Sequence, residues 1–231
     1  MPEKMILYYT DNTLEDSIGP GVREILKENS KGIPIVCVGK KHIDFGDLSI
    51  EIDLEERSRR AMFLQVQVGL NEAFTRLQPQ YVYIAEHDCL YPPGYFDFIP
   101  TDPDAFYYTH NKYFMDDKEF VHGGITNLST LICHYRLLLA HVNLRVYRIE
   151  KLNMKKGGWA NCEPAVSGND TLGEVKLRET TYPVVDIRHG KNLSKIYGER
   201  PFPERLREQA QQQIPYWGDH TKLRERIGWQ V

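Results

Sequence analysis

The uncharged stretch from Tyr81 to Ala85 constrains the fold of this chain more than any other. Its residues are aromatic, β-branched or small, which is typical of a strand buried on both faces of a parallel sheet. Glu86, His87 and Asp88 follow directly, and the turn signal Pro-Pro-Gly comes at residues 92–94. We therefore expect two carboxylates and an imidazole at the carboxyl end of a central strand, the edge where open α/β sheets bind ligands.

These three polar side chains support two interpretations. Carboxylate oxygens suit Mg²⁺ or Mn²⁺, and a histidine can join them as a ligand, so the turn is a candidate metal site. Alternatively, Glu86 and Asp88 only cap a helix that begins near Pro93. Three polar residues in a row after so apolar a strand favour the metal site.

The amino-terminal part of the chain predicts a βαβ unit. Residues 5–9 and 33–38 are apolar and strand-like, and Pro20 fits the first turn of a helix between them. The two strands should be parallel, joined by a right-handed crossover. The loop after the first strand then lies at the same sheet edge as Glu86, and either receives the base or ribose of a nucleotide or is simply solvated. Its candidate residues are Thr10, Asp11 and Asn12.

A long helix is expected before the central strand. Asp53 and Glu56 form a capping box, and apolar residues then recur at helical spacing up to residue 77, so one face belongs to the core. The core positions are Phe63, Val66, Leu70, Phe74 and Leu77. The first turns carry Arg57, Arg59 and Arg60, where cations are slightly unfavourable, so these arginines either hold phosphate or lie on a solvated face.

Shorter elements are expected in the rest of the chain. We predict a helical turn over 95–99, strands over 48–52, 105–109, 128–133 and 184–187, a hairpin within 110–124, a helix over 134–142 and a charged helix beyond Pro203. A tail that packs through Tyr216, Trp217, Ile227 and Trp229 closes the chain. The predicted organisation is a catalytic domain, residues 1–200, and a small helical annex, residues 201–231.

Composition narrows the class of protein. The 231 residues carry a formal net charge of -3, which excludes a strongly basic protein that coats nucleic acid but leaves room for a local basic face. Four cysteines without a CxxC pair indicate reduced thiols and a cytoplasmic location. They are Cys37, Cys89, Cys133 and Cys162. No stretch is apolar enough for a signal peptide or a membrane span, so we expect no membrane partner.

The βαβ opening, the arginine-bearing helix and the acid-x-acid turn together resemble the GT-A glycosyltransferases, in particular the glycosyltransferase-2-like branch. The resemblance is strongest over residues 81–94 and implies an α/β fold, with a Rossmann-like mixed central sheet flanked by helices. It also implies metal-dependent transfer of a sugar from a nucleotide sugar, such as a UDP-sugar, to an acceptor hydroxyl. The motif here reads Glu86-His87-Asp88, where the family has Asp-x-Asp.

By this resemblance, Asp88 binds Mn²⁺ or Mg²⁺, and Glu86 faces the ribose or a water on the metal. His189, after the last predicted strand, is a further metal ligand. The loop from Thr10 to Asn12 holds the nucleobase. The remaining predicted contacts to the nucleotide sugar are His87, Arg59 and Arg60.

Transfer with inversion also needs a carboxylate that accepts the acceptor's proton. Glu163, in a turn flanked by Trp and Gly, is the first candidate, and Asp170 is the second. The alternative is that Glu163 is an acidic loop residue without a catalytic role. His122 and His134 are interpreted as structural.

Two basic stretches, residues 145–156 and 188–200, bear on the acceptor. Tyr147, Trp159 and Tyr197 are interleaved with their cations, and aromatic stacking beside a cationic track is one way to hold nucleic acid. The chain is similar in build to compact glycosyltransferases of bacterial viruses, which modify hydroxymethylated bases in DNA. The alternative is a solvated face on an enzyme that glycosylates a saccharide or a small molecule.

Three other classes of protein share parts of this pattern. A nucleotidyltransferase should carry a Gly-rich, arginine-containing loop after the first strand, whereas residues 9–19 read YTDNTLEDSIG. A zinc hydrolase of the HEXXH type is disfavoured because that pattern is absent from the sequence. A catalytically silent module that binds a nucleotide sugar is compatible with the sequence, although metal, base and loop candidates occurring together favour an enzyme.

Overall fold

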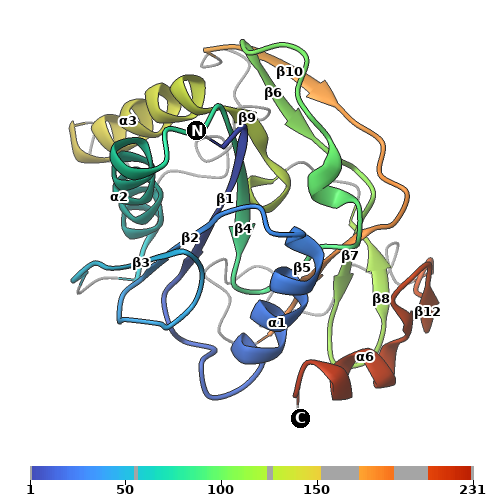
Figure 1. Cartoon of the computed structure of the whole chain (residues 1–231). Coiled ribbons are helices and arrows are strands. Elements are labelled where there is room, and N and C mark those ends of the chain that lie inside the picture. The colour runs from blue at the N-terminus through green and yellow to red at the C-terminus, as the bar shows by residue number, and fades with distance from the viewer. Residues whose placement is uncertain (1, 55–56, 124–126, 152–171, 190–207, 230–231) are drawn as a thin grey trace.

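A mixed β-sheet forms the centre of the computed structural model, which describes residues 2–54, 57–123, 127–151, 172–189 and 208–229. The sheet has seven strands in the order β10-β6-β9-β4-β1-β2-β3 (Figure 1). These strands are β1 (Lys4–Thr10), β2 (Ile35–Gly39), β3 (Leu48–Glu51), β4 (Tyr81–Glu86), β6 (Ala105–Tyr108), β9 (Ile132–His134) and β10 (Glu174–Leu177). A second sheet has the order β5-β11-β7-β8 and comprises β5 (Cys89–Leu90), β7 (Lys112–Met115), β8 (Phe120–His122) and β11 (Val184–Ile187).

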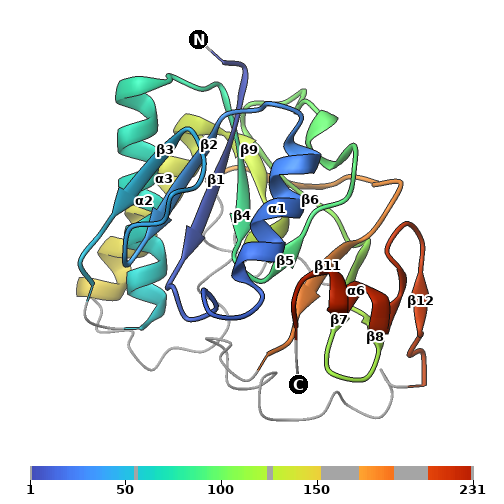
Figure 2. The same cartoon turned by 60° about the horizontal axis from the view of Figure 1, so that its bottom comes forward.

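Helices cover both faces of the main sheet (Figure 2). The helices are α1 (Gly19–Ser30), α2 (Arg59–Arg76), α3 (Tyr135–Lys151) and α6 (His220–Arg226), with 3₁₀ turns η1 (Tyr95–Asp97) and η2 (Leu128–Thr130). One core joins the sheet to α2 and α3, and another joins the opposite face to α1 and to the segment after β5. Strand β1 pairs in parallel with both β2 and β4. Strand β9 is antiparallel to β4, so the sheet is mixed. The predicted α/β class with a mixed central sheet is confirmed.

Helix α2 packs very closely on the sheet at Gly69. A Cβ atom at that position would lie 2.5 Å from Leu7 Cδ1 and 2.7 Å from Val38 Cγ2. The helix begins after Ser58, whose side chain accepts a hydrogen bond from the Ala61 amide, so the predicted cap at Asp53 is wrong. A serine oxygen satisfies a free amide of the first turn just as an aspartate would.

Three other predictions, one on a core residue and two on elements, differ from the structure. Phe74, expected in the core, is half exposed and stacks on the ring of Tyr135 at 5.1 Å. The predicted strand over 128–133 begins with the 3₁₀ turn η2, because only Ile132–His134 pairs with β4. Helix α3 runs to Lys151, well past the predicted end at residue 142.

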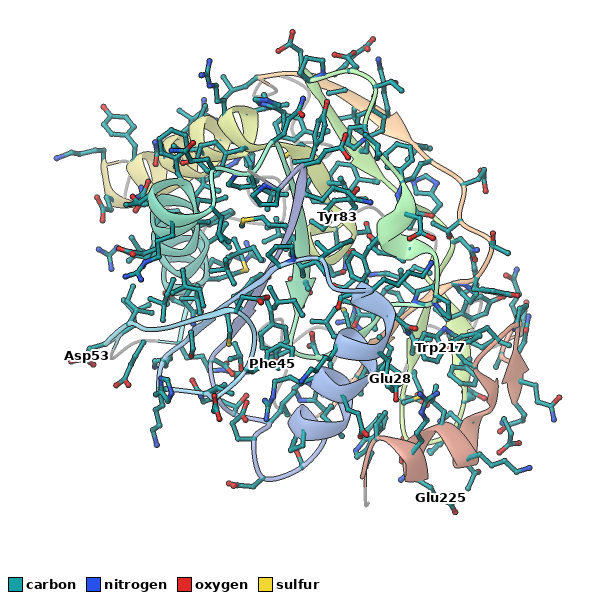
Figure 3. The ribbon with its side chains drawn as sticks, viewed as in Figure 1. Glu28, Phe45, Asp53, Tyr83, Trp217 and Glu225 are labelled. Carbon is teal, nitrogen blue, oxygen red and sulfur yellow. The ribbon has the colours of Figure 1, made fainter. Side chains whose placement is uncertain are left out.

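The carboxyl-terminal residues 208–229 pack on α1 and the β7–β8 hairpin. They contain β12 (Gln213–Ile214), β13 (Gly218–Asp219) and α6. Trp217 (Figure 3) donates through Nε1 to the carbonyl of Pro183 at 2.7 Å, just before β11. Ile227 is buried against Gly21 of α1, where a Cβ would lie 2.6 Å from the Ile227 backbone. Tyr216, predicted to pack on the core, is instead 42% exposed.

The predicted boundary between catalytic domain and annex, at residue 200, falls outside the described residues and stays a prediction. Within the described ranges, no helix combines the length and the apolar character needed to cross a bilayer.

Candidate active site

The turn after β4 is closed by a buried tyrosine. The hydroxyl of Tyr91 accepts a hydrogen bond from the Glu86 amide at 3.1 Å and donates to the carbonyl of Ser129 at 2.9 Å. Burial raises the pKa of Tyr91 well above its usual range, so the hydroxyl stays a neutral donor. The polar residues after β4 are therefore held on a fixed turn.

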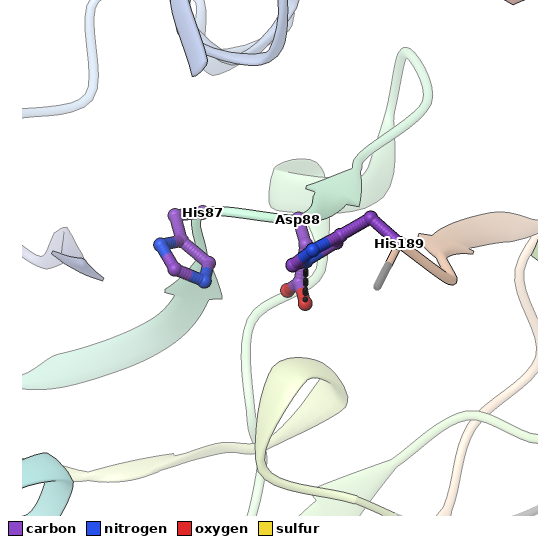
Figure 4. A group of neighbouring side chains, drawn as sticks. All are labelled: His87, Asp88 and His189. Carbon is purple, nitrogen blue, oxygen red and sulfur yellow. Dashed lines mark hydrogen bonds and ion pairs between the residues drawn. The ribbon is translucent and has the colours of Figure 1, made fainter. Parts of the chain in front are cut away.

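Strand β11 carries His189 to this turn. β5 directly follows the turn and pairs antiparallel with β11, so that Cys89 lies opposite Asp186. The Ile187 amide then donates to the Asp88 carbonyl at 2.7 Å. As a result, His189 Nε2 lies 3.4 Å from Asp88 Oδ2, although 101 positions separate the two residues (Figure 4).

Asp88 is ionised although it is buried. Burial opposes its charge, but the hydrogen bond with His189 and the electrostatic influence of His87, His189 and Arg188 outweigh that effect and hold the pKa of Asp88 below its ordinary value. His87, Asp88 and His189 each offer one ligand atom, and these atoms lie within 4.8 Å of one another. Ligand atoms around one ion are about 3–4 Å apart, given bonds of about 2.1 Å. The donor set therefore fits one divalent cation after a small closure.

Glu86 is held at the rim of this group by the neighbouring strand. Tyr9 lies opposite Glu86 in the β1–β4 ladder, and its hydroxyl donates to Glu86 Oε1. On the other side, Cys89 Sγ lies 4.0 Å from Glu86 Oε2 and 3.9 Å from Asp88 Oδ1. Burial raises the pKa of the Cys89 thiol, so this group is a weak neutral donor between two carboxylates.

The loop after β1 contacts the same turn. Thr10 Oγ1 lies 2.8 Å from His87 Nδ1, and Asp11 Oδ1 lies 3.5 Å from the same nitrogen. Asp11 also accepts from Thr13 and from Arg57 Nε. Burial works against the charge of Asp11, but His87, Thr13 and Arg57 lower its pKa overall. The loop and the turn after β4 therefore form one hydrogen-bonded unit.

Asn12 joins this loop to the segment after β2. Its backbone is left-handed, with φ 62°, a conformation that asparagine tolerates better than most residues. Its side chain accepts from the Lys41 amide at 2.9 Å and donates to the Lys41 carbonyl at 3.3 Å. Asn12 thus holds the predicted nucleobase loop against the segment after β2.

The arginines at the start of α2 have separate environments. Arg57 pairs with Asp11, whereas Arg60 Nη2 pairs with Glu150 of α3 at 2.7 Å. Arg59 is the first residue of α2. Contact of Arg59 and Arg60 with phosphate stays a prediction.

A buried ion cluster supports the strand that carries His189. Lys112 Nζ lies 2.9 Å from Asp186 Oδ2, and the lysine side chain is fully buried. Arg188 and Asn127 each approach the same oxygen at 3.3 Å. This cluster was not predicted from the sequence, although Asp186, a charge inside the apolar run 184–187, was a signal for it. Tyr9 and Tyr91 were also missed, because a tyrosine in an apolar run looks like a core residue.

Several predicted residues lie outside the described ranges: Glu163, Asp170, Cys162, Lys155, Lys156, Trp159 and Tyr197. Three cations of the first basic stretch are described, Arg145, Arg148 and Lys151, and Arg145 is not where the sequence suggested. Arg145 is only 1% exposed on α3, so it does not belong to a solvent-facing cationic track. It lies on the stripe of α3 that packs on the core, next to Val146. His122 and His134, interpreted as structural, end β8 and β9.

No protein-family profile and no curated protein matches the chain by sequence. Solved structures resemble it in fold. One is a glycosyltransferase involved in glycosylation of the major capsid of the virus PBCV-1, with 11% identity and a TM-score of 0.47 over 77% of this chain and 82% of that one. Another is the catalytic domain of Drosophila β1,4-galactosyltransferase 7 in complex with xylobiose, with 11% identity and a TM-score of 0.44 over 78% and 66%.

A third solved structure is the glycosyltransferase GlyE of Streptococcus pneumoniae, with 10% identity and a TM-score of 0.42 over 78% of this chain and 46% of that one. All three are glycosyltransferases by name, the class that residues 81–94 resemble. At such identities and scores, an activity has to be inferred from the side chains of the site itself.

Proposed function

We propose that this protein is a metal-dependent glycosyltransferase that moves a sugar from a UDP-sugar, or a related nucleotide sugar, to an acceptor hydroxyl. One observation carries the proposal. Asp88 and His189, far apart in the sequence, meet at the carboxyl edge of the central strand. Glu86 and the loop from Thr10 to Asn12 border the same place, where open α/β sheets bind nucleotides.

The proposed roles follow from the charge that the reaction develops. Transfer expels a nucleoside diphosphate with concentrated negative charge. Mn²⁺ or Mg²⁺ bound at the site would act as a Lewis acid and a template for that leaving group. Asp88 and His189 would hold the ion, and the low pKa of Asp88 keeps its carboxylate available as a ligand.

The donor's other parts would contact the rim of the site. Tyr9 fixes one oxygen of Glu86, so the carboxylate is oriented to accept hydrogen bonds from the ribose hydroxyls. The loop from Thr10 to Asn12 would receive the nucleobase. Arg59 is the first residue of α2, two positions after Arg57, which pairs with Asp11 of this loop. Arg60 would reach a phosphate only by leaving its partner Glu150.

A carboxylate has to accept the proton of the attacking hydroxyl if configuration is inverted. Glu163 is the first candidate for this base and Asp170 the second. Asp186, although close to the turn, is engaged by Lys112 and Arg188 and is therefore not free to act as a base.

For the acceptor we favour a saccharide or small molecule over a hydroxymethylated base in DNA. Burial of Arg145 removes one cation from the predicted track for DNA. Tyr147, 58% exposed on α3, remains available for stacking. A base in duplex DNA would also have to leave the stack to reach the donor. The DNA interpretation keeps the support of Lys155, Lys156 and the later basic stretch.

A panel of nucleotide sugars with Mn²⁺ tests the proposal. We expect one donor to raise the melting temperature, because a ligand of the folded state stabilises it, and to release nucleoside diphosphate when acceptor is added. A silent binding module would show the thermal shift without release. A nucleotidyltransferase would instead release pyrophosphate from a nucleoside triphosphate. Absence of any shift and any release across the panel would contradict the proposal.

A further inference from the structure

His87 lies between the loop after β1 and the pair formed by Asp88 and His189. Its Nδ1 is engaged by the Thr10 hydroxyl at 2.8 Å and by Asp11 at 3.5 Å. Figure 4 shows the ring turning its other nitrogen toward Asp88 and His189. Among the residues that the structure describes, none hydrogen-bonds that nitrogen, Nε2. The contacts of Nδ1 thus orient the ring, and Nε2 is available to bind a metal ion.

We propose that His87 is the third protein ligand of the metal, so that the site is a two-histidine, one-carboxylate site for a transition-metal ion rather than for Mg²⁺. The inference rests on the proposed metal-dependent function for the location of the ion. It moves His87 from the nucleotide-sugar contacts, where the sequence placed it, to the metal ligands. It also narrows the metal from Mn²⁺ or Mg²⁺ to Mn²⁺ and similar ions such as Co²⁺.

The geometry and chemistry of the donors support this assignment. One ligand atom from each of His87, Asp88 and His189 lies within 4.8 Å of the other two. The two imidazole rings stand nearly edge to face, with centroids 6.2 Å apart at 73°, so neither ring blocks the other's nitrogen. Imidazole suits first-row transition metals, whereas Mg²⁺ prefers oxygen ligands and water.

The contacts behind His87 are those expected of a metal-binding histidine. Such a ligand donates its second N–H to a hydroxyl, carbonyl or carboxylate, which fixes the tautomer and raises the basicity of the ligating nitrogen. Here Thr10 and Asp11 can accept from Nδ1–H, and Asp11 is itself held by Thr13 and Arg57. Thr10 and Asp11 are therefore positioning residues for the metal as well as parts of the predicted nucleobase loop.

A simple ion pair between His87 and Asp11 is the competing explanation. Arg57 is already a charged partner of Asp11, and the 3.5 Å separation from His87 is longer than a good charge-assisted hydrogen bond. An ion pair also gives no reason for Nε2 to face Asp88 and His189. The ligand assignment accounts for both sides of the ring.

Direct metal binding tests the inference without using turnover. Affinities for Mn²⁺, Co²⁺ and Mg²⁺ are measured by titration calorimetry on the full chain, with circular dichroism to check folding. Loss of an outer-sphere partner of a ligand typically costs 10–100-fold in affinity, so Thr10→Val should weaken Mn²⁺ and Co²⁺ binding by about 10-fold. His87→Gln removes the ligand itself and should cost at least the upper end of that range, about 100-fold. His122→Gln, which changes an exposed histidine of β8, should bind like the wild type.

Electron spin-echo spectroscopy of the Mn²⁺-loaded wild type, labelled with ¹⁵N-histidine, adds a readout that does not depend on a variant's folding. Two coordinated imidazoles support the inference, and one overturns it. Wild-type Mn²⁺ affinity in His87→Gln, or Mg²⁺ binding as tight as Mn²⁺, also overturns it. Nucleoside diphosphate release is assayed separately. If the protein releases diphosphate but only one imidazole coordinates Mn²⁺, the His87 assignment alone is refuted. If two imidazoles coordinate Mn²⁺ but no diphosphate is released, the proposed function alone is refuted.

Discussion

Replacing Lys112 by methionine tests whether the buried ion cluster supports the site. Lys112 and Asp186 are 2.9 Å apart, with side chains 0% and 5% exposed. Removing one partner of a buried pair costs about 3–5 kcal/mol, because the remaining charge stays in a poorly solvating interior. Asp186 keeps Arg188 and Asn127, each at 3.3 Å, so we expect the lower end, about 3 kcal/mol.

Urea unfolding of Lys112→Met and of a matched control, Lys31→Met, measures this cost. Lys31 pairs with Asp97 on the surface, where both side chains are more than half exposed, and its loss should cost about 0–1 kcal/mol. Lys112→Met should also weaken metal binding, because β11 carries both Asp186 and His189 toward Asp88. If the two variants unfold at the same urea concentration, Lys112 and Asp186 do not form the buried pair described here.

Three other substitutions address the base, the packing and the acceptor. Glu163→Gln keeps the side chain's shape but removes the proton acceptor, so turnover should fall by about 10²–10⁴-fold with donor binding little changed, and a near-wild-type rate would transfer the role to Asp170 or indicate retention. Gly69→Ala should destabilise the protein by about 1–3 kcal/mol in thermal unfolding, since the new methyl group meets Leu7 and Val38, and a stabilised variant would show that α2 is not packed this closely. Lys155→Glu with Lys156→Glu should leave transfer to a saccharide unchanged. Salt-dependent binding of hydroxymethylated duplex DNA that this pair of substitutions weakens would instead favour the DNA acceptor.

The central part of the fold was predictable because its strands are uniformly apolar. Residues of β1, β2 and β4 are buried on both faces, and such runs are recognisable without any tertiary information. The polar turn after β4 stands out against them, which is why Asp88 was predicted as a metal ligand. His189 was predicted only through the family resemblance, and the structure brings it to Asp88.

The rest of the site depends on pairings that no local pattern encodes. β5 is a two-residue strand, and its antiparallel pairing with β11 sets the place of His189. Tyr9 contacts Glu86 only because β1 and β4 are neighbours in that register. β10 was not predicted, because it is a mostly exposed edge strand without an apolar run. Lys112 gave no signal, since a lysine is rarely buried unless it is paired.

The most direct test of the account is the metal dependence of nucleoside diphosphate release in the wild type and in Asp88→Asn. Release from the preferred nucleotide sugar is followed while Mn²⁺ is titrated into protein stripped with EDTA, and circular dichroism confirms that both proteins are folded. We predict that EDTA abolishes release in the wild type, that Mn²⁺ restores it, and that Asp88→Asn stays inactive at Mn²⁺ concentrations that saturate the wild type. Turnover by Asp88→Asn at the wild-type rate in the presence of EDTA would contradict the account.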